Sequence, residues 1–427
     1  MSRLKQRARH LSLGAFVRLL SLLLAWTAGC AVRGLPPPAP ADLAPTVILI
    51  SFDGWRFDYA QRYSCPNLHR LMKRGVSADL VPSFPSKTFP NHYTLVTGLR
   101  PGRHGIVANN MKDPASGRRF AMSDRKEVQD PMWWGGEPLW VALERAGQKT
   151  APFFWPGSEA PIGGRLPSYE VPYDGKMPGA ARVDQVLRWL DLPAAQRPTF
   201  LTLYFDDVDG AGHHDGPLST AVRRAVRRVD GYLGRLLSGL EERGIAGRVN
   251  LVVVSDHGMA ETSLDRVVVL DDLVPLDAVD VVDINPTLGL DPRPGREAEV
   301  YAALAGAHPH LEVYRREETP ERWHYRDHSR IPPIVGVADE GWQVMTRAMR
   351  EAAARRVGPG RTGAHGYDPA EARSMRGLFV AAGPAFKVGV RVPPFDNVNV
   401  YPALAAILGV PPADNDGDPA VARSLLR

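Results

Sequence analysis

The sequence predicts an α/β protein with a mainly parallel central sheet and helices on both of its faces. Apolar runs that are too continuous for half-exposed strands recur along the chain. They lie at residues 47–52, 150–155, 200–205, 249–254 and 378–382. Segments with helical spacing of apolar residues lie between them, at residues 183–190, 219–243 and 342–355. Buried strands that alternate with helices are typical of a parallel sheet covered on both sides.

The N-terminal segment has the pattern of an export signal. Basic residues precede an apolar run at residues 19–26, which is only about half as long as a helix that spans a bilayer. Small residues then precede Cys30, as in a bacterial lipobox, although Thr27 stands where that motif usually has Leu. We therefore expect residues 1–30 to be a signal peptide with a possible lipid anchor at Cys30, and the protein to be periplasmic or a membrane-anchored lipoprotein. Ordinary signal cleavage and an uncleaved anchor are the alternatives.

The next segment, residues 31–45, is rich in proline and is expected to be an extended linker. Residues 46–427 then form one large folded domain. The formal net charge of +5 comes from five basic residues that precede Cys30, where no acidic residue stands. Because the rest of the chain is formally neutral, we expect no nucleic-acid partner, and a membrane contact only through the lipid anchor.

Polar residues follow three of the apolar runs directly or within a few positions. Asp53 ends the first run, Asp209 follows the third, and Asp256 and His257 follow the fourth. In open α/β sheets, ligands bind outside the carboxyl ends of the strands. We therefore expect these four side chains to meet at one edge of the sheet.

Three further residues have the same chemistry. Thr88 stands two positions before Pro90, a residue that suits the first turn of a helix, so Thr88 should lie at a helix N-terminus, where backbone N–H groups bind anions. His213 stands four residues after Asp209, and His365 lies in a glycine-rich loop. Each spacing is weak evidence alone, but three Asp, three His and one hydroxyl are enough to hold two zinc-like ions around a nucleophile. The combination indicates hydrolysis of a phosphate ester.

A segment from about residue 280 to 340 breaks the alternation of strands and helices. It is rich in Pro, Arg, His and aromatic residues and shows little helical periodicity. We expect it to form an inserted lobe over the edge of the sheet.

Over about residues 46–410 the chain resembles the nucleotide pyrophosphatase/phosphodiesterase family of the alkaline phosphatase superfamily. The most specific likeness is Thr-Phe-Pro-Asn-His-Tyr at residues 88–93, followed by His-Gly-Ile-Val at 104–107 and by Asn109. Further likenesses are at residues 66–68, 97–101 and 320–325. The resemblance implies an alkaline phosphatase-like fold, with residues 46–427 as a phosphodiesterase catalytic domain.

The resemblance also implies two Zn²⁺ ions, each held by its own group of ligands. One group is Asp209, His213 and His365, and the other is Asp53, Asp256, His257 and the Thr88 oxygen. Val208 departs from the family, which often has Pro before the ligand Asp, but the spacing from Asp to His is intact.

In such an enzyme Thr88 would be the nucleophile of a phospho-threonine intermediate. Asn109 would donate to a phosphate oxygen beside the backbone amide of Thr88 or Phe89, a pattern that favours diesters over monoesters. Phe89, Tyr173 and Tyr204 resemble the aromatic slot that holds a nucleobase by stacking. We therefore expect small nucleotides as substrates and nucleoside 5′-monophosphates as products.

Other functions are less consistent with the sequence. Family members that act on choline or glycerophospholipid head groups share the metal site, so this substrate class is the main alternative. A sulfatase-like enzyme is disfavoured because the sequence has no Cys-X-Pro-X-Arg signature. A surface lipoprotein without catalytic activity is disfavoured because the ligand set is intact.

Overall fold

The computed structural model describes residues 42–357 and 360–427. The predicted signal peptide, the Cys30 anchor and most of the predicted linker lie outside the described residues. None of the helices in the described part is long and apolar enough to cross a membrane. The predicted division of the chain at residues 30, 45 and about 280–340 stays a prediction.

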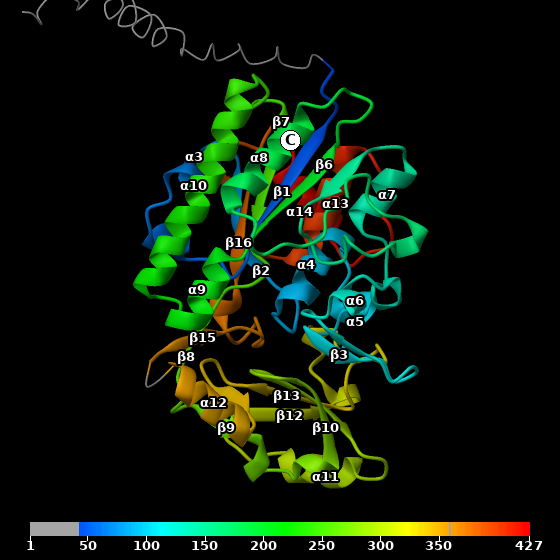
Figure 1. The fold of residues 1–427 in the computed structure, drawn as a ribbon, viewed down its shortest axis with the longest axis vertical. Helices are drawn as coiled ribbons and strands as arrows, with labels where there is room; N and C mark the ends of the chain where they lie inside the picture. Colours follow the sequence, from blue (N-terminus) through cyan, green and yellow to red (C-terminus); the bar gives the residue numbers. More distant parts are fainter. Residues whose placement is uncertain (1–41, 358–359) are drawn as a thin grey trace, which may run out of the picture. The chain divides into compact units, whose positions relative to one another are not determined.

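A central sheet of eight strands dominates the described part (Figure 1). Its order is β17-β2-β16-β7-β1-β6-β5, and β18 also pairs with β2. The strands are β1 (Thr46–Phe52), β2 (Val76–Val81), β5 (Thr150–Pro152), β6 (Phe200–Phe205), β7 (Val249–Val254), β16 (Gly377–Ala382), β17 (Val390–Arg391) and β18 (Phe395–Asp396). Strand β16 is antiparallel to both β2 and β7, whereas the other pairings are parallel. The predicted mainly parallel sheet is therefore confirmed.

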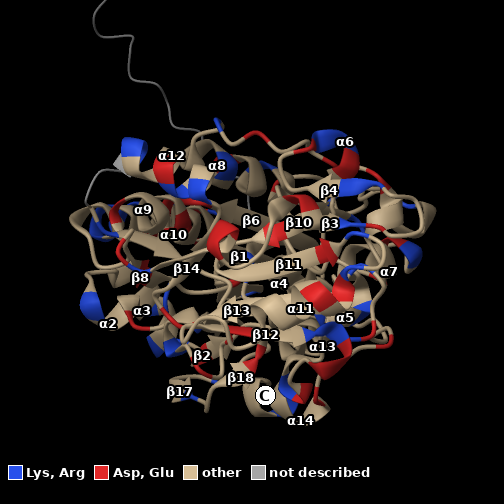
Figure 2. Cartoon of the chain, turned by 90° about the horizontal axis from the view of Figure 1, so that it is seen from below, with Lys and Arg blue, Asp and Glu red and all other residues tan. Residues whose placement is uncertain are grey.

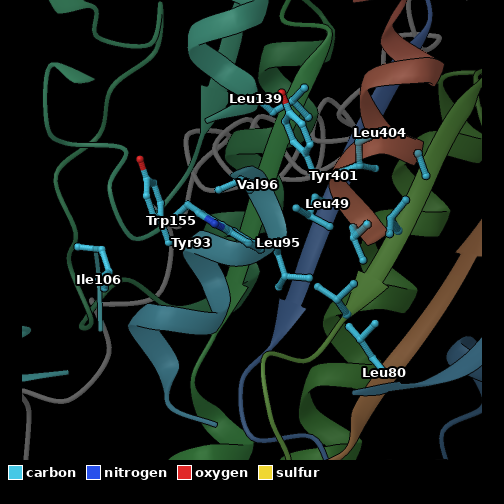
Figure 3. Close-up of a cluster of buried hydrophobic side chains, with 14 of the residues drawn as sticks. Leu49, Leu80, Tyr93, Leu95, Val96, Ile106, Leu139, Trp155, Tyr401 and Leu404 are labelled. Carbon is cyan, nitrogen blue, oxygen red and sulfur yellow. The ribbon is translucent and has the colours of Figure 1, made fainter. Parts of the chain in front are cut away.

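Both faces of this sheet are buried, because every residue of β1 is buried. Val47 and Leu49 belong to the apolar cluster on one face, and Ile48 and Ile50 belong to the cluster on the other. Figure 3 shows the first cluster, in which side chains of two helices pack toward Leu49. The helices of that face are α4 (Thr88–Thr97), α7 (Leu139–Arg145) and α13 (Val400–Leu408), and those of the other face are α3 (Pro66–Lys73), α8 (Gly179–Leu190) and α10 (Thr220–Glu242).

Two of the three predicted helices are confirmed as α8 and α10, but the third prediction, residues 342–355, was wrong at its start. Residues Gln343–Met345 form strand β14, which pairs in parallel with β9 (Val267–Val269). Helix α12 (Arg347–Val357) begins only after Thr346, whose hydroxyl accepts a hydrogen bond from the Met349 N–H.

The apolar run at residues 150–155 forms a strand only over Thr150–Pro152. It cannot continue as a strand through Phe154, which has φ of 59°, a value that a β-strand does not adopt.

A second, antiparallel sheet lies below the central sheet in Figure 1. Its order is β10-β11-β13-β12, and its strands are β10 (Val279–Ile284), β11 (Thr287–Pro292), β12 (Leu311–Arg315) and β13 (Ile334–Ala338). Helix α11 (Glu297–Leu304) packs on it through a separate apolar cluster. Figure 2, viewed from this side, shows basic and acidic residues interspersed over the described part.

The remaining elements are short. They are α2 (Tyr59–Arg62), α5 (Pro101–His104), α6 (Arg125–Val128), α9 (Asp207–Asp215), α14 (Pro419–Leu425), β3 (Asn110–Lys112), β4 (Arg119–Ala121), β8 (Ala260–Thr262) and β15 (Thr362–Ala364). Single-turn 3₁₀ helices join several of them.

Helix α3 is capped by a residue from another helix. Its own N-cap, Cys65, makes no capping hydrogen bond through its side chain. Asp230 of α10 supplies one instead, because its carboxylate accepts hydrogen bonds from the backbone N–H of Leu68 at 2.8 Å and of Asn67 at 3.3 Å. The Asn67 side-chain amide adds a third bond at 3.0 Å. A buried carboxylate at a helix N-terminus also meets the positive end of the helix dipole.

We expect Asp230→Ala to lower the free energy of unfolding by about 1–3 kcal/mol, since it leaves two helix N–H groups without their acceptor. Urea unfolding followed by circular dichroism measures this difference. Glu241→Ala is the matched control, because Glu241 joins the same two helices through an exposed pair with Arg70 at 3.3 Å and should change the free energy by less than about 0.5 kcal/mol. Equal effects of the two variants would contradict the role of Asp230 as a cap.

Candidate metal and phosphate site

The ends of two neighbouring strands bring Asp53 and the Asp256-His257 pair together. Asp53 directly follows β1 and Asp256 closely follows β7, so both arrive at the carboxyl edge of the sheet. His257 Nε2 lies 3.0 Å from Asp256 Oδ2 and 3.5 Å from Asp53 Oδ1. It also lies 3.1 Å from the Thr88 hydroxyl, and Thr88 is the first residue of helix α4. These four residues form one group of potential ligands.

A second group lies beside the first. Asp209 and His213 stand one turn apart on α9, and His213 Nε2 is 3.4 Å from Asp209 Oδ1. His365, which follows β15, places its Nε2 3.1 Å from His213 Nε2 and 3.8 Å from Asp209 Oδ1. The rings of His257 and His365 stack with centroids 3.5 Å apart, so the two groups are adjacent.

The three histidines are oriented by the same contact. Nδ1 of His213, His257 and His365 donates to a backbone carbonyl at 2.9 Å in each case, and the acceptors are Gly363, Gly258 and Ser86. A proton on Nδ1 leaves the lone pair of Nε2 free to bind a metal, which is how metal-binding histidines are usually held. Burial, followed by the neighbouring His257 and His213, also lowers the pKa of His365 well below its ordinary value. Each of these histidines therefore directs its Nε2 away from the backbone, and His365 is held in its neutral form.

One oxygen of each carboxylate in this region lacks a hydrogen-bond donor. Within the described residues, Asp53 Oδ1, Asp209 Oδ1 and Asp256 Oδ2 are buried and accept no hydrogen bond. Burial, and then the charges of Asp256 and Asp209, raise the pKa of Asp53 well above its ordinary value. Burial by itself would also raise the pKa of Asp256, but His257 and His92 outweigh burial and hold this pKa well below the usual range. Buried carboxylate oxygens that face one another without donors, together with free imidazole nitrogens, fit divalent cations.

His92 lies close to this region but is not suited to bind a metal. Its Nδ1 is 3.3 Å from Asp256 Oδ2, and the ligand atoms of His92, Asp53 and Asp256 lie within 4.8 Å of one another. However, Nδ1 donates to the Thr88 carbonyl at 2.9 Å, and Nε2 pairs with the Ser51 hydroxyl at 2.7 Å. Because both ring nitrogens are occupied, His92 has a structural role between β1 and the first turn of α4.

Two residues support the ligands in ways that the sequence did not indicate. The Tyr204 hydroxyl donates to Asp53 Oδ2 at 2.6 Å, so a residue predicted only for the aromatic slot also orients a carboxylate. Gly54 has φ of 69°, and its N–H lies 3.3 Å from Asp256 Oδ1. A side chain at Gly54 would come within 2.8 Å of the Asp209 Cα. Glycine is therefore required where β1 approaches α9.

The residues predicted to bind phosphate lie beside Thr88, with one difference from the prediction. The Phe89 N–H donates to Asn109 Oδ1 at 3.0 Å, so this backbone amide is directed at Asn109 and not toward an open position. The contact fixes the orientation of the Asn109 amide and leaves its Nδ2 as the group that can donate to an anion.

The structure brings two of the three predicted slot residues together. The rings of Tyr173 and Tyr204 are 6.2 Å apart, and Tyr173 is 38% exposed. Phe89 packs instead against Phe120 and Trp134, with ring centroids 5.8 and 6.1 Å away.

Sequence reasoning missed two residues that hold the tyrosines in place. The ring of Phe154 is 5.3 Å from that of Tyr173. Buried Arg182 lies 5.1 Å from the centre of the Phe154 ring and donates to the Tyr204 carbonyl at 2.7 Å. Neither residue stands in a motif that would have revealed its role.

Comparisons with known proteins were made on sequence and on structure. A family model described as type I phosphodiesterase / nucleotide pyrophosphatase matches residues 47–368. Human ectonucleotide pyrophosphatase/phosphodiesterase family member 5 is 37% identical over 373 residues, which cover 87% of this chain and 76% of that protein. Human bis(5′-adenosyl)-triphosphatase ENPP4 is 35% identical over 390 residues, covering 90% of this chain and 83% of that protein. A solved structure of an inactive murine ENPP5 in complex with AMP matches with a TM-score of 0.83 and 36% identity, covering 90% of this chain and all of that one.

We expect His257→Asn to weaken metal binding by roughly tenfold or more, whereas His92→Asn should leave the metal content unchanged. In both variants the amide nitrogen of Asn replaces Nδ1 and only Nε2 is lost. The comparison therefore isolates the contribution of Nε2, which faces Asp256 and Asp53 in His257 and the Ser51 hydroxyl in His92. Inductively coupled plasma mass spectrometry after dialysis against limiting Zn²⁺ measures the content. Equal metal loss in the two variants would contradict the distinction between these histidines.

Proposed function

The chain belongs to the type I phosphodiesterase / nucleotide pyrophosphatase family, whose members are hydrolases of phosphodiester bonds, and from this premise we propose its substrate, metals and catalytic residues. It hydrolyses phosphodiester or pyrophosphate bonds of small nucleotides and releases nucleoside 5′-monophosphates. Thr88 is the nucleophile, and two Zn²⁺ ions are the cofactors. The observation that carries the proposal is the position of the Thr88 hydroxyl, 3.1 Å from His257 Nε2 at the N-terminus of α4.

The ligand chemistry supports two zinc ions. Imidazole nitrogen and carboxylate oxygen together suit Zn²⁺, whereas Mg²⁺ and Ca²⁺ favour sites made of oxygen alone. One ion would be held by Asp209, His213 and His365, and the other by Asp53, Asp256, His257 and the Thr88 oxygen. When bound, the ions lower the pKa of the Thr88 hydroxyl and offset charge on the phosphoryl group.

The proposed reaction has two displacements at phosphorus. The Thr88 oxygen attacks in line, the bond to the leaving alkoxide or phosphate breaks, and a phospho-threonine diester forms. Water then attacks the same phosphorus from the opposite side, which frees the Thr88 hydroxyl and releases the nucleoside monophosphate. Asn109 Nδ2 and the Thr88 N–H at the N-terminus of α4 orient the phosphate oxygens during both steps.

The surroundings of the site favour diesters over monoesters. A monoester carries an additional charged oxygen, which an arginine close to the phosphate would stabilise. The two arginines between Thr88 and Asn109 in the sequence are bound elsewhere, since Arg100 donates to Asp396 at 2.8 Å and Arg103 to Asp416 at 2.5 Å. Asn109 offers a neutral amide, which matches a diester with a single negative charge.

Nucleotides are the best supported diesters. Tyr173 and Tyr204 offer aromatic faces beside the metal ligand Asp53, and stacking of this kind accepts any base. Phe89 is the third residue of the proposed slot. Relatives support the same class, because murine ENPP5 has been solved with AMP and human ENPP4 is named a bis(5′-adenosyl)-triphosphatase.

The proposed location is outside the cytoplasm. The relatives are named ectonucleotide enzymes, which supports export of this chain. A bacterial periplasmic location and a lipid anchor at Cys30 are proposals that rest on the N-terminal sequence.

We expect the zinc-loaded protein to hydrolyse p-nitrophenyl thymidine 5′-monophosphate much faster than p-nitrophenyl phosphate. Thr88→Ala should lower the diester rate by roughly a thousandfold or more while metal remains bound, because the other ligands are intact. Thr88→Ser, which keeps the hydroxyl, should retain measurable activity. A near-normal rate for Thr88→Ala would refute the covalent route, and equal monoester turnover would refute the diester assignment. Faster cleavage of a choline diester than of the thymidine ester would indicate a lipid head-group substrate.

We expect Tyr173→Ala to raise KM for p-nitrophenyl thymidine 5′-monophosphate roughly tenfold, because a stacked base loses its partner. The control substrate is p-nitrophenyl methyl phosphate, a diester with the same leaving group and no nucleobase, whose kinetics should not change. Steady-state kinetics on both substrates measures the difference. Equal losses on the two substrates would show that Tyr173 does not contact the base.

A further inference from the structure

The residue just before Thr88 forms a buried ion pair with the second sheet. Lys87, the N-cap of α4, pairs through Nζ with the Asp283 carboxylate of β10. The side chains of Lys87 and Asp283 are only 5% and 7% exposed. Two charges removed from water at this position are costly unless each finds its partner, so the geometry of the pair is tightly constrained.

Asp283 also reaches the residue next to Asn109. Its Oδ1 accepts a hydrogen bond from Asn110 Nδ2 at 3.4 Å, and its Oδ2 accepts one from the Thr287 hydroxyl at 3.2 Å. One carboxylate of the second sheet therefore binds the segment that carries Thr88 and the segment that carries Asn109.

These two segments are bridged a second time without the second sheet. The Phe89 N–H donates directly to Asn109 Oδ1 at 3.0 Å. Residues 87–89 and 109–110 are thus joined by one direct bond and by one bridge through Asp283. The bond at Phe89 and the bridge at Lys87 lie on either side of Thr88 and together determine the distance and the angle between its hydroxyl and the Asn109 amide. With a single link, one segment could rotate relative to the other.

The stem of Lys87 is confined as well. Gly366, next to His365, lies against it so closely that an added Cβ would be 3.1 Å from Lys87 Cε and 3.0 Å from Pro286 Cδ. Pro286 belongs to the turn between β10 and β11. The lysine side chain is therefore enclosed by the turn of the second sheet and by the loop of a proposed metal ligand.

We propose that Asp283 is a positioning residue for the hydrolysis. Through its contacts with Lys87 and Asn110, it holds Thr88 and Asn109 at the separation that a phosphate diester needs. The inference rests on the proposed function, in which Thr88 attacks and Asn109 binds the phosphoryl oxygen. It makes the second sheet part of the catalytic machinery. Misplacement of reacting groups by about 1 Å can lower a rate by roughly a hundredfold, so this position is sensitive.

The test separates positioning from stability. Asp283→Asn and Lys87→Met each remove one charge and leave the other buried, so both should lower Tm and kcat. The double variant Lys87→Met/Asp283→Leu removes both charges and replaces them with apolar side chains, which restores stability in other buried pairs. We expect the double variant to recover a Tm near that of the wild type and an unchanged zinc content. Its kcat for p-nitrophenyl thymidine 5′-monophosphate should stay roughly ten- to hundredfold below that of the wild type, because Asp283 no longer positions Thr88 and Asn109.

Lys112→Met and Asp291→Asn are the matched controls. Lys112 of β3 pairs with Asp291 of β11 at 2.5 Å, so it joins the same two regions by the same chemistry, but it is partly exposed and two residues beyond Asn110. These controls should leave kcat within about twofold of wild type.

Each outcome gives a decision. A double variant that regains both Tm and wild-type kcat would overturn the proposal, because the pair would then act on stability alone. If the double variant does not fold, Asp283→Asn decides: normal kcat at normal zinc content overturns the proposal, and low kcat with unchanged KM supports it. Thr88→Ala distinguishes a failure of the proposed function from a failure of the role of Asp283. An active Thr88→Ala variant refutes the proposed function itself. An inactive Thr88→Ala variant, together with a fully active double variant, refutes only the role of Asp283.

Discussion

The buried carboxylates at the carboxyl ends of the central strands are the constraint on which the rest of the site depends. Oxygens of Asp53 and Asp256 lie within 4.8 Å of one another. In the described part, one buried oxygen each of Asp53, Asp209 and Asp256 accepts no hydrogen bond. Like charges repel strongly away from water. Such a cluster is stable only when positive charge lies among its members, which a bound divalent cation would supply, and the imidazole nitrogens beside it complete a donor set for that cation.

The fold supplies that arrangement mainly through the backbone. Three carbonyls orient the three histidines that we propose as ligands, and the carbonyls belong to strand β15 and to the loops that follow β7 and β2. Because the loops are held by the sheet and by the short β8–β15 pair, the ligands are preorganised and their side-chain freedom is small. The position of Gly54 against Asp209 has the same origin, since only a residue without a side chain allows β1 and α9 to approach so closely.

The second sheet is connected to helix α4, which begins with the proposed nucleophile Thr88, by more than surface contact. Lys87, buried in its pair with Asp283, directly precedes Thr88 in the chain. The second sheet thus contributes a buried charge beside the proposed catalytic residue. The Asp283 carboxylate also accepts hydrogen bonds from the neutral side chains of Asn110 and Thr287. With Lys87 it therefore has three donors, which lower the cost of its burial.

The sequence alone determined β1, β5, β6, β7 and β16 of the central sheet, the helices α8 and α10 and the order of the candidate ligands. Continuous apolar runs identified β1, β6 and β7 because both faces of a parallel sheet are buried, and the residues that follow these strands could be assigned to one edge. Strand β2 escaped this reasoning because Ser77 and Asp79 interrupt its apolar pattern, although both are buried in the structure. Asp79 is tolerated there by Arg391, which lies 312 residues away.

Only the tertiary structure decided which side chains share a hydrogen bond. His92 has both ring nitrogens occupied, by the Thr88 carbonyl and the Ser51 hydroxyl, whereas Nε2 of His257 faces the carboxylates of Asp256 and Asp53. The pairing of Lys87 with Asp283 and the capping of α3 by Asp230 likewise join residues more than 150 positions apart. Local sequence patterns reflect periodicity and burial, whereas contacts of this kind depend on the path of the whole chain.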